Sequence, residues 1–428
     1  MKISFFTLGC KLNQAETDEL KKELLKLGFF VVPFKEKSDV AVIRACGVTC
    51  GASQTTREMI RSAKRRGAYI MATGCLENKD LSEINFVAKN NAEIIKHLKT
   101  VVPYEAKGFL NTDDKGSFAN AQDDKTTVPA DRTRAFIKIQ NGCNFNCTYC
   151  IIPSFRGRSA SIPAAEILKK ITQAERQGFQ EIVLTGVNIC QYREGKIDLS
   201  GLLKKILKKT KIPRIRLGSL DPRLISDELI KIYSHPRLLP HWHLSLQSGS
   251  DEVLKNMRRG YTTKQYGAIV KKLRALNPLF SLTTDIIVGF PGETDQQFQE
   301  TCAFVRKIEF TKVHVFPFSS RPGTAAEKMP DQVQDKIKKE RVKKLLAIAN
   351  QTSKKFISKF IGLTRPVLFE NNPDTKSARA GGLVRGKKNL WKGYSPEYFV
   401  VEIKSAKNLA NKIKPVKISA TNAKQDRQ

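Results

Sequence analysis

The 428-residue chain contains no long hydrophobic run and comparatively few acidic residues. No stretch approaches the roughly 20 consecutive apolar residues that a transmembrane helix needs, so we expect no integral membrane protein and no membrane partner. Acidic residues number 41 against 75 lysines and arginines, which gives a formal net charge of +34. A charge of this size predicts salt-sensitive binding to a polyanion, although it does not identify which one.

A complete secretion signal is also missing at the N-terminus. The apolar stretch from Ile3 to Leu8 is shorter than the usual hydrophobic region of about 7–15 residues, and Lys11 follows Cys10 at once. We therefore expect a cytoplasmic protein. The nine cysteines are an odd number spread over a long chain, which favours metal ligation or chemistry over disulfide pairing.

The first hundred residues alternate between strand-like and helix-like segments, which predicts an α/β domain with a parallel sheet. The expected strands are Ile3–Leu8, Asp39–Arg44 and Ala68–Thr73, and the expected helices are Glu16–Leu27 and Ser53–Arg66. We assign this domain to residues 1–110. Residues 111–130 are mostly polar and cannot bury enough apolar surface to order themselves, so we interpret them as a linker or surface loop.

Residues 131–360 contain six further strand candidates separated by amphipathic segments. These strands are Ala135–Gln140, Glu181–Gly186, Arg214–Leu217, Trp242–Leu246, Leu282–Val288 and Lys312–Phe316. Six β/α units are too few for an eight-stranded barrel and predict an open, partial (β/α)6 barrel, with its active site at the carboxyl ends of the strands. The long basic segment Asp331–Phe360 is expected to form a helix that packs back on this barrel.

The composition changes again after residue 360. Short alternating segments predict a small β-barrel over residues 361–420, with strands at Pro366–Glu370, Tyr398–Ile403 and Lys414–Ile418. From residue 361 to residue 428 there are 14 lysines and arginines against five acidic residues. A basic β-barrel attached to an enzyme-like core favours RNA binding, and a solvated basic surface is the alternative.

Three cysteines stand close together in the segment Asn141-Gly-Cys143-Asn-Phe-Asn-Cys147-Thr-Tyr-Cys150. Offsets of 0, 4 and 7 also fit one face of a helix, but Gly142, Asn144 and Asn146 favour a loop. A structural zinc site needs four protein ligands, and no nearby histidine or fourth cysteine completes one. Three cysteines on a four-iron cluster leave one iron free for a non-protein ligand.

This cysteine spacing, with an aromatic residue before the third cysteine, resembles the radical S-adenosylmethionine (SAM) superfamily. In that superfamily SAM chelates the open iron, and one electron from the cluster cleaves SAM to a 5′-deoxyadenosyl radical that abstracts hydrogen from an unactivated carbon. The resemblance implies that Cys143, Cys147 and Cys150 bind a [4Fe–4S] cluster and that SAM is the second cofactor. It implies no catalytic residues beyond the cluster ligands.

Three more cysteines, Cys10, Cys46 and Cys75, each follow a predicted strand. Residues just beyond the ends of parallel strands converge on one edge of the sheet, although buried structural cysteines are an alternative reading. The surrounding segments resemble the ligand segments of the methylthiotransferases: Thr7-Leu-Gly-Cys10-Lys-Leu-Asn-Gln14, Arg44-Ala-Cys46-Gly-Val-Thr49 and Thr73-Gly-Cys75-Leu-Glu77. That resemblance implies a second [4Fe–4S] cluster on these three cysteines, with Cys50 a further thiol close by in sequence.

The resemblance to the methylthiotransferases extends over nearly the whole chain. Further similar segments are Arg216–Pro222, His243–Asp251, Asp285–Thr294 and Phe318–Thr324. The C-terminal domain, with Gly393, Tyr394 and Tyr398, resembles a TRAM domain, which is the RNA-binding module of these enzymes. The fold implied is therefore α/β with a radical SAM barrel between two smaller domains.

Three branches of the family modify isopentenyladenosine in tRNA, threonylcarbamoyladenosine in tRNA, or an aspartate of a ribosomal protein. The sequences around Cys10, at Arg216–Pro222 and at Thr185–Asn188 are most similar to those of the threonylcarbamoyladenosine branch. Ala15 and Gly218 differ from the residues usual in that branch. This similarity implies a C2-methylthiotransferase acting at position 37 of tRNA, with the anticodon arm and an electron-donor protein as partners. The alternatives are the other two branches and a non-catalytic iron–sulfur RNA-binding redox sensor.

Four residues outside the cysteine sets are candidate SAM contacts: Tyr149, Gly186, Ser219 and Gln247. Each also has a structural reading, such as packing in the barrel mouth for the tyrosine or a tight turn for the glycine. His241 and His243 are two residues apart on a predicted strand and therefore share a face. Without a third nearby ligand we interpret these histidines as packing or RNA contacts rather than as a metal site.

Overall fold

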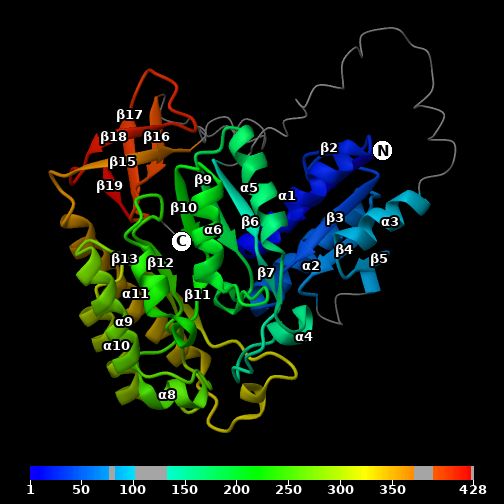
Figure 1. The fold of residues 1–428 in the computed structure, drawn as a ribbon. Coiled ribbons are helices and arrows are strands. Elements are labelled where there is room, and N and C mark those ends of the chain that lie inside the picture. The colour runs from blue at the N-terminus through cyan, green and yellow to red at the C-terminus, as the bar shows by residue number, and fades with distance from the viewer. Residues whose placement is uncertain (77–81, 102–132, 371–388, 426–428) are drawn as a thin grey trace. The chain divides into compact units, whose positions relative to one another are not determined.

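The computed structural model describes residues 1–76, 82–101, 133–370 and 389–425, and the chain divides into two compact units, Met1–Asp131 and Arg132–Gln428 (Figure 1). The predicted linker at residues 111–130 lies outside the described residues. Within those ranges, every helix is too short or too polar to cross a membrane.

The first unit is built around a five-stranded parallel sheet with the strand order β2-β1-β3-β4-β5. Its elements are β1 (Lys2–Thr7), α1 (Lys11–Lys26), β2 (Phe30–Val32), β3 (Val40–Ala45), α2 (Cys50–Arg65), β4 (Tyr69–Gly74), β5 (Phe86–Ala88) and α3 (Asn91–Val101). Val42 of β3 belongs to a core with Leu20 of α1, whereas Ile43 packs with Ile60 of α2. Because helices cover both faces, β3 is buried along its whole length.

The predicted parallel α/β domain is confirmed, and each of the three predicted strands is displaced by a single residue. The prediction missed β2 and β5, because three residues are too few to show an alternating pattern. Helix α1 begins at Lys11, earlier than the predicted Glu16. The residue before the helix is Cys10, which makes no side-chain capping hydrogen bond and therefore gives no start signal in the sequence.

The barrel of the second unit has seven parallel strands in the order β6-β9-β10 and β11-β12-β13-β14. Only Gly218 separates β10 from β11, so these two strands together occupy one of six barrel positions. The strands are β6 (Arg134–Lys138), β9 (Glu181–Thr185), β10 (Arg214–Leu217), β11 (Ser219–Leu220), β12 (His241–Leu244), β13 (Ser281–Val288) and β14 (Lys312–Pro317). The main helices are α5 (Ala164–Arg176), α6 (Leu199–Lys209), α7 (Asp227–Ile232), α8 (Asp251–Asn256), α9 (Thr263–Leu276), α10 (Asp295–Ile308) and α11 (Asp335–Ser358). This arrangement agrees with the expected partial (β/α)6 barrel.

The two faces of the barrel wall differ in chemistry. Trp242, Leu244, Val313 and Val315 point toward the helices and belong to the main hydrophobic core. Because side chains alternate along a strand, the residues between them point to the inner face. Those inward positions carry polar and charged side chains: Glu181, Arg214, Arg216, His241, His243, Thr283, Asp285 and His314. The interior of the barrel is therefore suited to bind polar groups.

A five-stranded antiparallel sheet with the order β18-β15-β16-β17-β19 forms the C-terminal part of the second unit. Its strands are β15 (Thr364–Phe369), β16 (Leu390–Tyr394), β17 (Val400–Lys404), β18 (Ile413–Lys417) and β19 (Ala423–Lys424). Phe356, in the last turn of α11, and Phe360, just beyond the helix, pack with Trp391 and Phe399 in the core of this sheet. The sheet is consistent with the expected small β-barrel, and the predicted long helix is confirmed as α11.

The loop Ser395–Tyr398, between β16 and β17, packs on the amino-terminal ends of the barrel strands. Arg216 of β10 donates hydrogen bonds of 2.8 Å to the carbonyl oxygens of Pro396 and Ser395. The Tyr398 ring stacks on His241, with 4.7 Å between ring centroids. The C-terminal sheet therefore covers this end of the barrel through specific contacts and is more than a tethered module.

One fully buried carboxylate, Glu181 of β9, balances the arginines beneath this loop. Its two oxygens accept from Nε of Arg214 at 2.7 Å and from Nε of Arg216 at 2.8 Å. Burial alone raises the pKa of a carboxyl, but the charges of Arg216, Arg214 and Arg134 outweigh it and hold the pKa of Glu181 at about 2. The group is therefore ionised in the folded protein at neutral pH.

Candidate functional site

Cys143, Cys147 and Cys150 lie in an irregular segment between β7 (Gln140–Asn141) and α4 (Ile152–Arg156). The segment is a loop, as Gly142 and its neighbours predicted, and it follows the carboxyl end of β6. All three cysteines are partly buried. An irregular loop can turn three thiols at offsets 0, 4 and 7 toward one centre.

The side chain of Gln140 organises this loop. Its amide nitrogen donates to the carbonyl oxygens of Asn141 at 2.8 Å and Gly142 at 2.7 Å, while its amide oxygen accepts from the Asn188 backbone N–H at 2.9 Å. A Cβ on Gly186 would lie 2.7 Å from the Gln140 carbonyl oxygen. Close approach of the Gln140 backbone therefore requires glycine at position 186, independently of any SAM contact.

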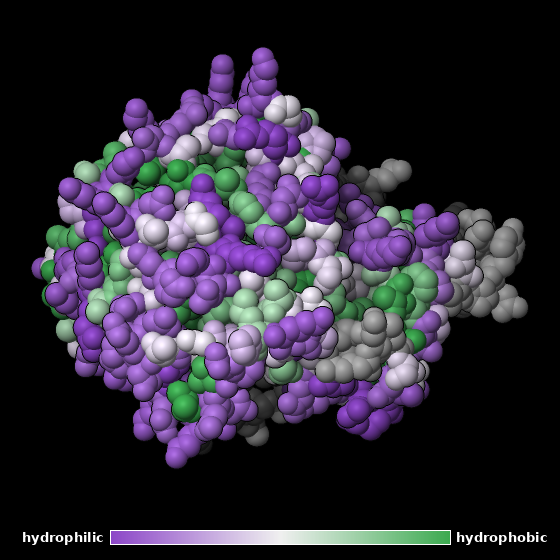
Figure 2. All heavy atoms as spheres, turned by 90° about the horizontal axis from the view of Figure 1, so that it is seen from below, coloured by the Kyte–Doolittle hydropathy of each residue, from purple (hydrophilic) through white to green (hydrophobic). Residues whose placement is uncertain are grey.

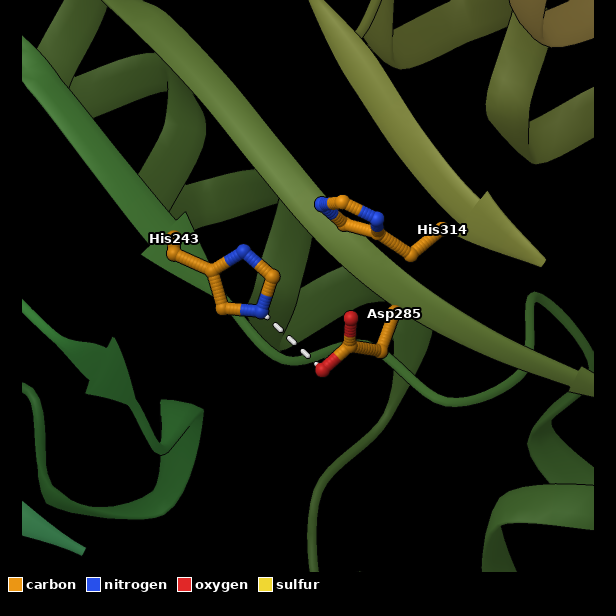
Figure 3. A group of neighbouring side chains, drawn as sticks. All are labelled: His243, Asp285 and His314. Atoms are coloured by element: carbon orange, nitrogen blue, oxygen red, sulfur yellow. Dashed lines mark hydrogen bonds and ion pairs between the residues drawn. The ribbon is translucent and has the colours of Figure 1, made fainter. Parts of the chain in front are cut away.

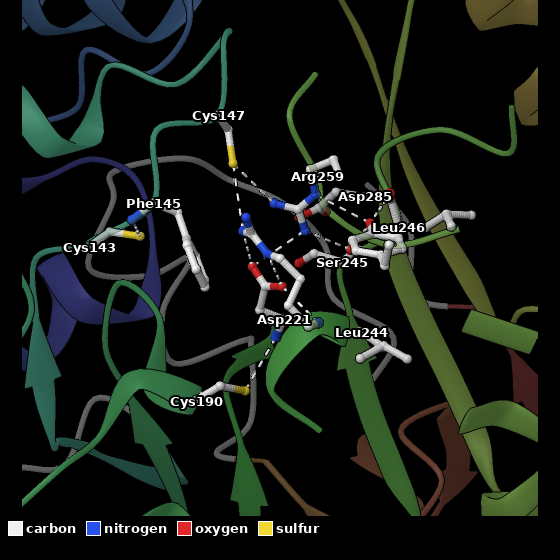
Figure 4. A network of polar contacts seen from close by, with 12 residues as sticks. Cys143, Phe145, Cys147, Cys190, Asp221, Leu244, Ser245, Leu246, Arg259 and Asp285 are labelled. Atoms are coloured by element: carbon white, nitrogen blue, oxygen red, sulfur yellow. Dashed lines mark hydrogen bonds and ion pairs between the residues drawn. The ribbon is translucent and has the colours of Figure 1, made fainter. Parts of the chain in front are cut away.

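Two arginines are directed at the sulfur of Cys147 (Figure 4). Nη1 of Arg259 lies 3.4 Å and Nη2 of Arg223 lies 3.7 Å from this Sγ. Asp221 holds both guanidinium groups, with oxygen–nitrogen distances of 2.6 Å to Arg223 and 3.5 Å to Arg259. The Arg223 guanidinium also lies over the Phe145 ring, 3.4 Å from its centroid. The arrangement places fixed positive charge beside a cysteine sulfur.

The sulfur atoms of this loop also accept hydrogen bonds from neutral donors. The Phe145 backbone N–H donates to Cys143 Sγ at 3.5 Å, and Gln191 Nε2 lies 3.8 Å from the same sulfur. Burial raises the pKa of the Cys143 thiol and raises that of Cys150 to about 11. N–H groups aimed at cysteine sulfur stabilise metal-bound thiolates, so these residues fit a [4Fe–4S] cluster that takes three protein ligands.

The remaining candidate SAM contacts occupy different surroundings. Tyr149 packs against a buried cluster that includes Met257 and Phe290. Ser219 is exposed on β11 and lies opposite His243 in the strand register. Gln247 has a positive φ of 73° and continues the line of β12 beyond its end. Contact of these side chains with SAM remains a prediction.

Cys10, Cys46 and Cys75 follow the carboxyl ends of β1, β3 and β4, which are adjacent strands of one parallel sheet. Nδ2 of Asn13 donates to the carbonyl oxygens of Leu8 at 2.7 Å and Ala45 at 3.0 Å, and so ties the Cys10 turn to the Cys46 segment. The topology therefore brings the three thiols to one edge of the sheet.

Gly9 shows how closely these segments approach each other. It has a positive φ of 99°, and a Cβ at this position would lie 2.9 Å from Cys46 Cβ and 3.0 Å from Cys46 Sγ. Only glycine accommodates both the left-handed backbone and this neighbour. Cys50 is the first residue of α2, four residues after Cys46, and it is exposed.

Sequence reasoning missed four residues that shape the Cys143–Cys150 loop: Gln140, Asp221, Arg223 and Arg259. They lie on three separate segments, with Asp221 and Arg223 on the same turn, and none shows a metal-ligand spacing. The segment Arg216–Pro222 is singled out by its resemblance to the family and includes Asp221. The contact of Asp221 with Arg223 is local, but its contact with Arg259, 38 residues later, arises only in the folded barrel. A tertiary contact of this kind leaves no periodic signal in the chain.

Comparison with known proteins identifies two family matches and several similar proteins. Residues 137–305 match the radical SAM superfamily, and residues 2–95 match the uncharacterized protein family UPF0004. The threonylcarbamoyladenosine tRNA methylthiotransferase MtaB of Aquifex aeolicus is 37% identical over 388 residues, which cover 87% of this chain and 94% of that protein. The protein of the same name in Bacillus subtilis is 35% identical over 433 residues, covering 97% and 93%.

A relative with another substrate in its name reaches nearly the same identity. The tRNA-2-methylthio-N(6)-dimethylallyladenosine synthase of Fusobacterium nucleatum is 34% identical over 412 residues, covering 92% of this chain and 94% of that protein. Among solved structures, the radical S-adenosylmethionine methyltransferase TsrM of Kitasatospora setae has a TM-score of 0.56 at 14% identity, covering 76% of this chain and 77% of that one. At that identity the likeness is one of fold alone.

Proposed function

This chain belongs to the radical SAM methylthiotransferase family, and we propose that it transfers a methylthio group to C2 of threonylcarbamoyladenosine at position 37 of tRNA. The observation that carries the proposal is the presence of two cysteine triads: Cys10, Cys46 and Cys75 after the carboxyl ends of three parallel strands, and Cys143, Cys147 and Cys150 in the loop that follows β6 and β7. The sequence around Cys10 favours threonylcarbamoyladenosine over isopentenyladenosine as the substrate. Identities of 37% and 34% to relatives of the two kinds do not by themselves separate these substrates.

We infer that Cys143, Cys147 and Cys150 hold one [4Fe–4S] cluster with SAM, and that Cys10, Cys46 and Cys75 hold a second cluster. When bound, the first cluster supplies the electron that cleaves SAM to a radical able to remove hydrogen from an unactivated carbon. The chain contributes the three thiolates, the loop geometry set by Gln140, and the positive charge of Arg223 and Arg259. An electron-donor protein supplies the reducing equivalent, and the tRNA substrate favours a cytoplasmic location.

The tRNA partner accounts for the strongly basic composition. Five exposed lysines lie on or beside the C-terminal sheet: Lys404, Lys407, Lys412, Lys414 and Lys417. The face drawn in Figure 2 is likewise dominated by hydrophilic side chains. Positive charge binds the phosphate backbone without reading sequence, and splayed bases of a single-stranded loop are the usual targets of specific RNA recognition. We propose that this surface holds the anticodon arm.

Nucleoside analysis tests the substrate directly. Reconstituted enzyme, SAM, a reductant and a sulfur source are incubated anaerobically with tRNA from a strain that lacks the gene, and digested nucleosides are separated by mass spectrometry. The proposal expects 2-methylthio-threonylcarbamoyladenosine to appear. Formation of 2-methylthio-isopentenyladenosine instead, or modification of a ribosomal protein aspartate with tRNA unchanged, contradicts the proposed substrate and favours another branch of the family.

Replacing Gly9 with alanine is expected to empty the second cluster site. The added Cβ meets Cys46, so iron should fall from about eight toward about four per chain. Gly28→Ala is the matched control, because Gly28 also has a positive φ, of 82°, but no atom within 4 Å of the built Cβ. Both substitutions should lower the free energy of unfolding by roughly 1–2 kcal/mol, because alanine is strained in a left-handed backbone conformation. Equal iron content in the two variants would contradict the assignment.

Replacing Arg259 with glutamine is expected to lower the reduction potential of the SAM-binding cluster by on the order of 50 mV, about 1.2 kcal/mol for one electron. The reason is that reduction adds negative charge beside a guanidinium that lies 3.4 Å from Cys147 Sγ. Arg258→Gln removes the same charge from the exposed neighbouring residue and should change the potential little. An anaerobic redox titration followed by electron paramagnetic resonance (EPR) measures both, and equal shifts would refute the local role of Arg259.

Replacing Lys412, Lys414 and Lys417 with alanine is expected to weaken tRNA binding and its salt dependence. If each lysine neutralises one phosphate, the slope of log affinity against log salt should become shallower by up to about 3. The control variant removes Lys205, Lys208 and Lys209, which are exposed on α6. Fluorescence anisotropy with labelled tRNA at several salt concentrations gives both slopes, and a larger effect of the α6 variant would contradict binding by the C-terminal sheet.

A further inference from the structure

Two histidines and one aspartate converge inside the barrel from three adjacent strands (Figure 3). His243 lies on β12, Asp285 on β13 and His314 on β14. In the strand register Asp285 is directly opposite His314, and His243 is opposite Thr283, two residues earlier on β13. The three side chains therefore point to the same inner face. We refer to them as the His–Asp–His cluster.

The distances within the His–Asp–His cluster suit a single ion. One ligand atom from each residue lies within 4.8 Å of the other two, and His243 Nε2 is 3.0 Å from Asp285 Oδ2. Ligand atoms bound at about 2.0–2.1 Å from zinc are roughly 2.9–3.4 Å from each other. Nε2 of His243 and Oδ2 of Asp285 already have this separation. The ligand nitrogen of His314 is within 4.8 Å of both atoms, so a movement of its ring by at most about 1.5 Å brings it into the same range.

The His243 imidazole is oriented by a second set of contacts. Its Nδ1 lies 3.0 Å from the Thr283 hydroxyl, which also lies 3.0 Å from Nε2 of His241. Thr283 is buried. Metal-bound histidines generally use their second ring nitrogen in such a hydrogen bond, which fixes the ring and leaves the other nitrogen for the ion. Thr283 therefore holds Nε2 of His243 toward Asp285.

The chemistry and exposure of the three ligands point to one class of ion. A carboxylate with two neutral imidazoles carries one negative charge, which attracts a divalent cation, and this donor set is typical of zinc and of ferrous iron. The side chains of His243 and Asp285 are 13% and 29% exposed, so the cluster is reachable from the interior of the barrel. Three protein ligands leave at least one position for water or another oxygen donor, as in sites where the metal takes part in binding or chemistry.

We propose that His243, Asp285 and His314 form a mononuclear site for a divalent transition-metal ion of the zinc class inside the barrel, distinct from both cysteine triads. From the sequence alone, His241 and His243 lack a third nearby ligand. In the structure His243 lies beside two further possible ligands, Asp285 and His314, on the following strands, whereas the His241 ring stacks on Tyr398. This site does not depend on the identity of the tRNA nucleoside that the enzyme modifies.

Zinc binding to the cluster-loaded enzyme tests the proposal. Anaerobically reconstituted protein, with its cysteine triads occupied, is titrated with zinc in competition with a chromogenic chelator, which gives the affinity. It is then desalted, and zinc and iron are measured per chain. We expect about one zinc ion per chain in the wild type and at least a tenfold loss of affinity in Asp285→Asn and His314→Gln. Thr283→Val, which keeps a β-branched side chain, should weaken zinc binding by about 10–100-fold through the loss of orientation.

Controls separate this site from adventitious zinc on thiols. His235→Gln changes a histidine outside the cluster and should retain wild-type zinc and iron. X-ray absorption at the zinc edge should show nitrogen and oxygen ligands at about 2.0–2.1 Å and no sulfur at about 2.3 Å. No retained zinc in the wild type, zinc unchanged in Asp285→Asn and His314→Gln, or a zinc–sulfur shell would each overturn the proposal. Equal iron in all variants shows that they fold and keep their iron–sulfur clusters.

Discussion

Replacing Cys147 with alanine will abolish the reductive cleavage of SAM. If Cys143, Cys147 and Cys150 hold the cluster as proposed, this variant keeps only two of its three ligands, so iron should fall by about four per chain. 5′-Deoxyadenosine formation should then drop to the level of SAM incubated without enzyme. The measurement is chromatographic quantification of 5′-deoxyadenosine after anaerobic incubation with SAM and a reductant, together with the iron content of the same sample.

Cys302→Ala is the control for the Cys147 variant. Cys302 is buried in the main core of the barrel, so its replacement removes a thiol and leaves a small cavity without touching the cysteine loop. It should retain the iron content and 5′-deoxyadenosine formation of the wild type. Continued product formation by Cys147→Ala would contradict the ligand assignment. No product from the wild type would instead favour the non-catalytic redox sensor.

Replacing Glu181 with glutamine is expected to have the largest effect on stability. The change leaves the buried Arg214 and Arg216 without the carboxylate that both of them contact, whereas Arg134 keeps its ion pair with Glu370. Removing one partner of a buried ion pair typically costs about 3–5 kcal/mol. For a protein of this size the midpoint of thermal unfolding should fall by roughly 10 °C. Calorimetry or circular dichroism of the full-length chain measures the change.

The matched control makes the same chemical change on the surface. Glu166 pairs with Lys170 one turn along α5, and its side chain is 51% exposed. Glu166→Gln should change the free energy of unfolding by less than about 0.5 kcal/mol, because exposed pairs contribute little. Similar midpoints of thermal unfolding for Glu181→Gln and Glu166→Gln would contradict a stabilising role of the buried Glu181 carboxylate.

Acidification should remove the contribution of Glu181 in the wild type. Its pKa is about 2 in the folded protein, below the ordinary value of 4.5, so its stabilisation is fully present above pH 4.5. As the pH falls from 4.5 toward 2, the difference in stability between wild type and Glu181→Gln should shrink. Urea unfolding of cluster-free protein at pH 7 and pH 3 measures this difference, and a constant value would argue against an ionised Glu181.

Local sequence patterns anticipate the scaffold well, because strands and cysteine spacing are encoded within short segments. Glycine and asparagine beside Cys143 predict a loop, and a loop is found. The positions of Cys10, Cys46 and Cys75 after three strands predict convergence, and adjacent strands β1, β3 and β4 bring them to one edge. In both cases the signal lies within a few residues of the site.

The features that the sequence does not reveal depend on residues far apart in the chain. Arg259 reaches Cys147 because the segment that follows α8 packs against the cysteine loop, and no spacing in the sequence marks that arginine. His243 joins Asp285 and His314 only through the parallel strand register. Burial of a single glutamate among three arginines likewise appears only once the C-terminal sheet covers the barrel. Tertiary contacts, rather than periodicity, decide such sites.

The most direct test of the two-cluster account is the iron and sulfide content of anaerobically reconstituted protein with each cysteine triad removed in turn. We expect about eight irons per chain in the wild type and about four in each triple alanine variant, one lacking Cys10, Cys46 and Cys75 and the other lacking Cys143, Cys147 and Cys150. A wild type with only about four irons, or an unchanged iron content after loss of the first triad, would contradict the account.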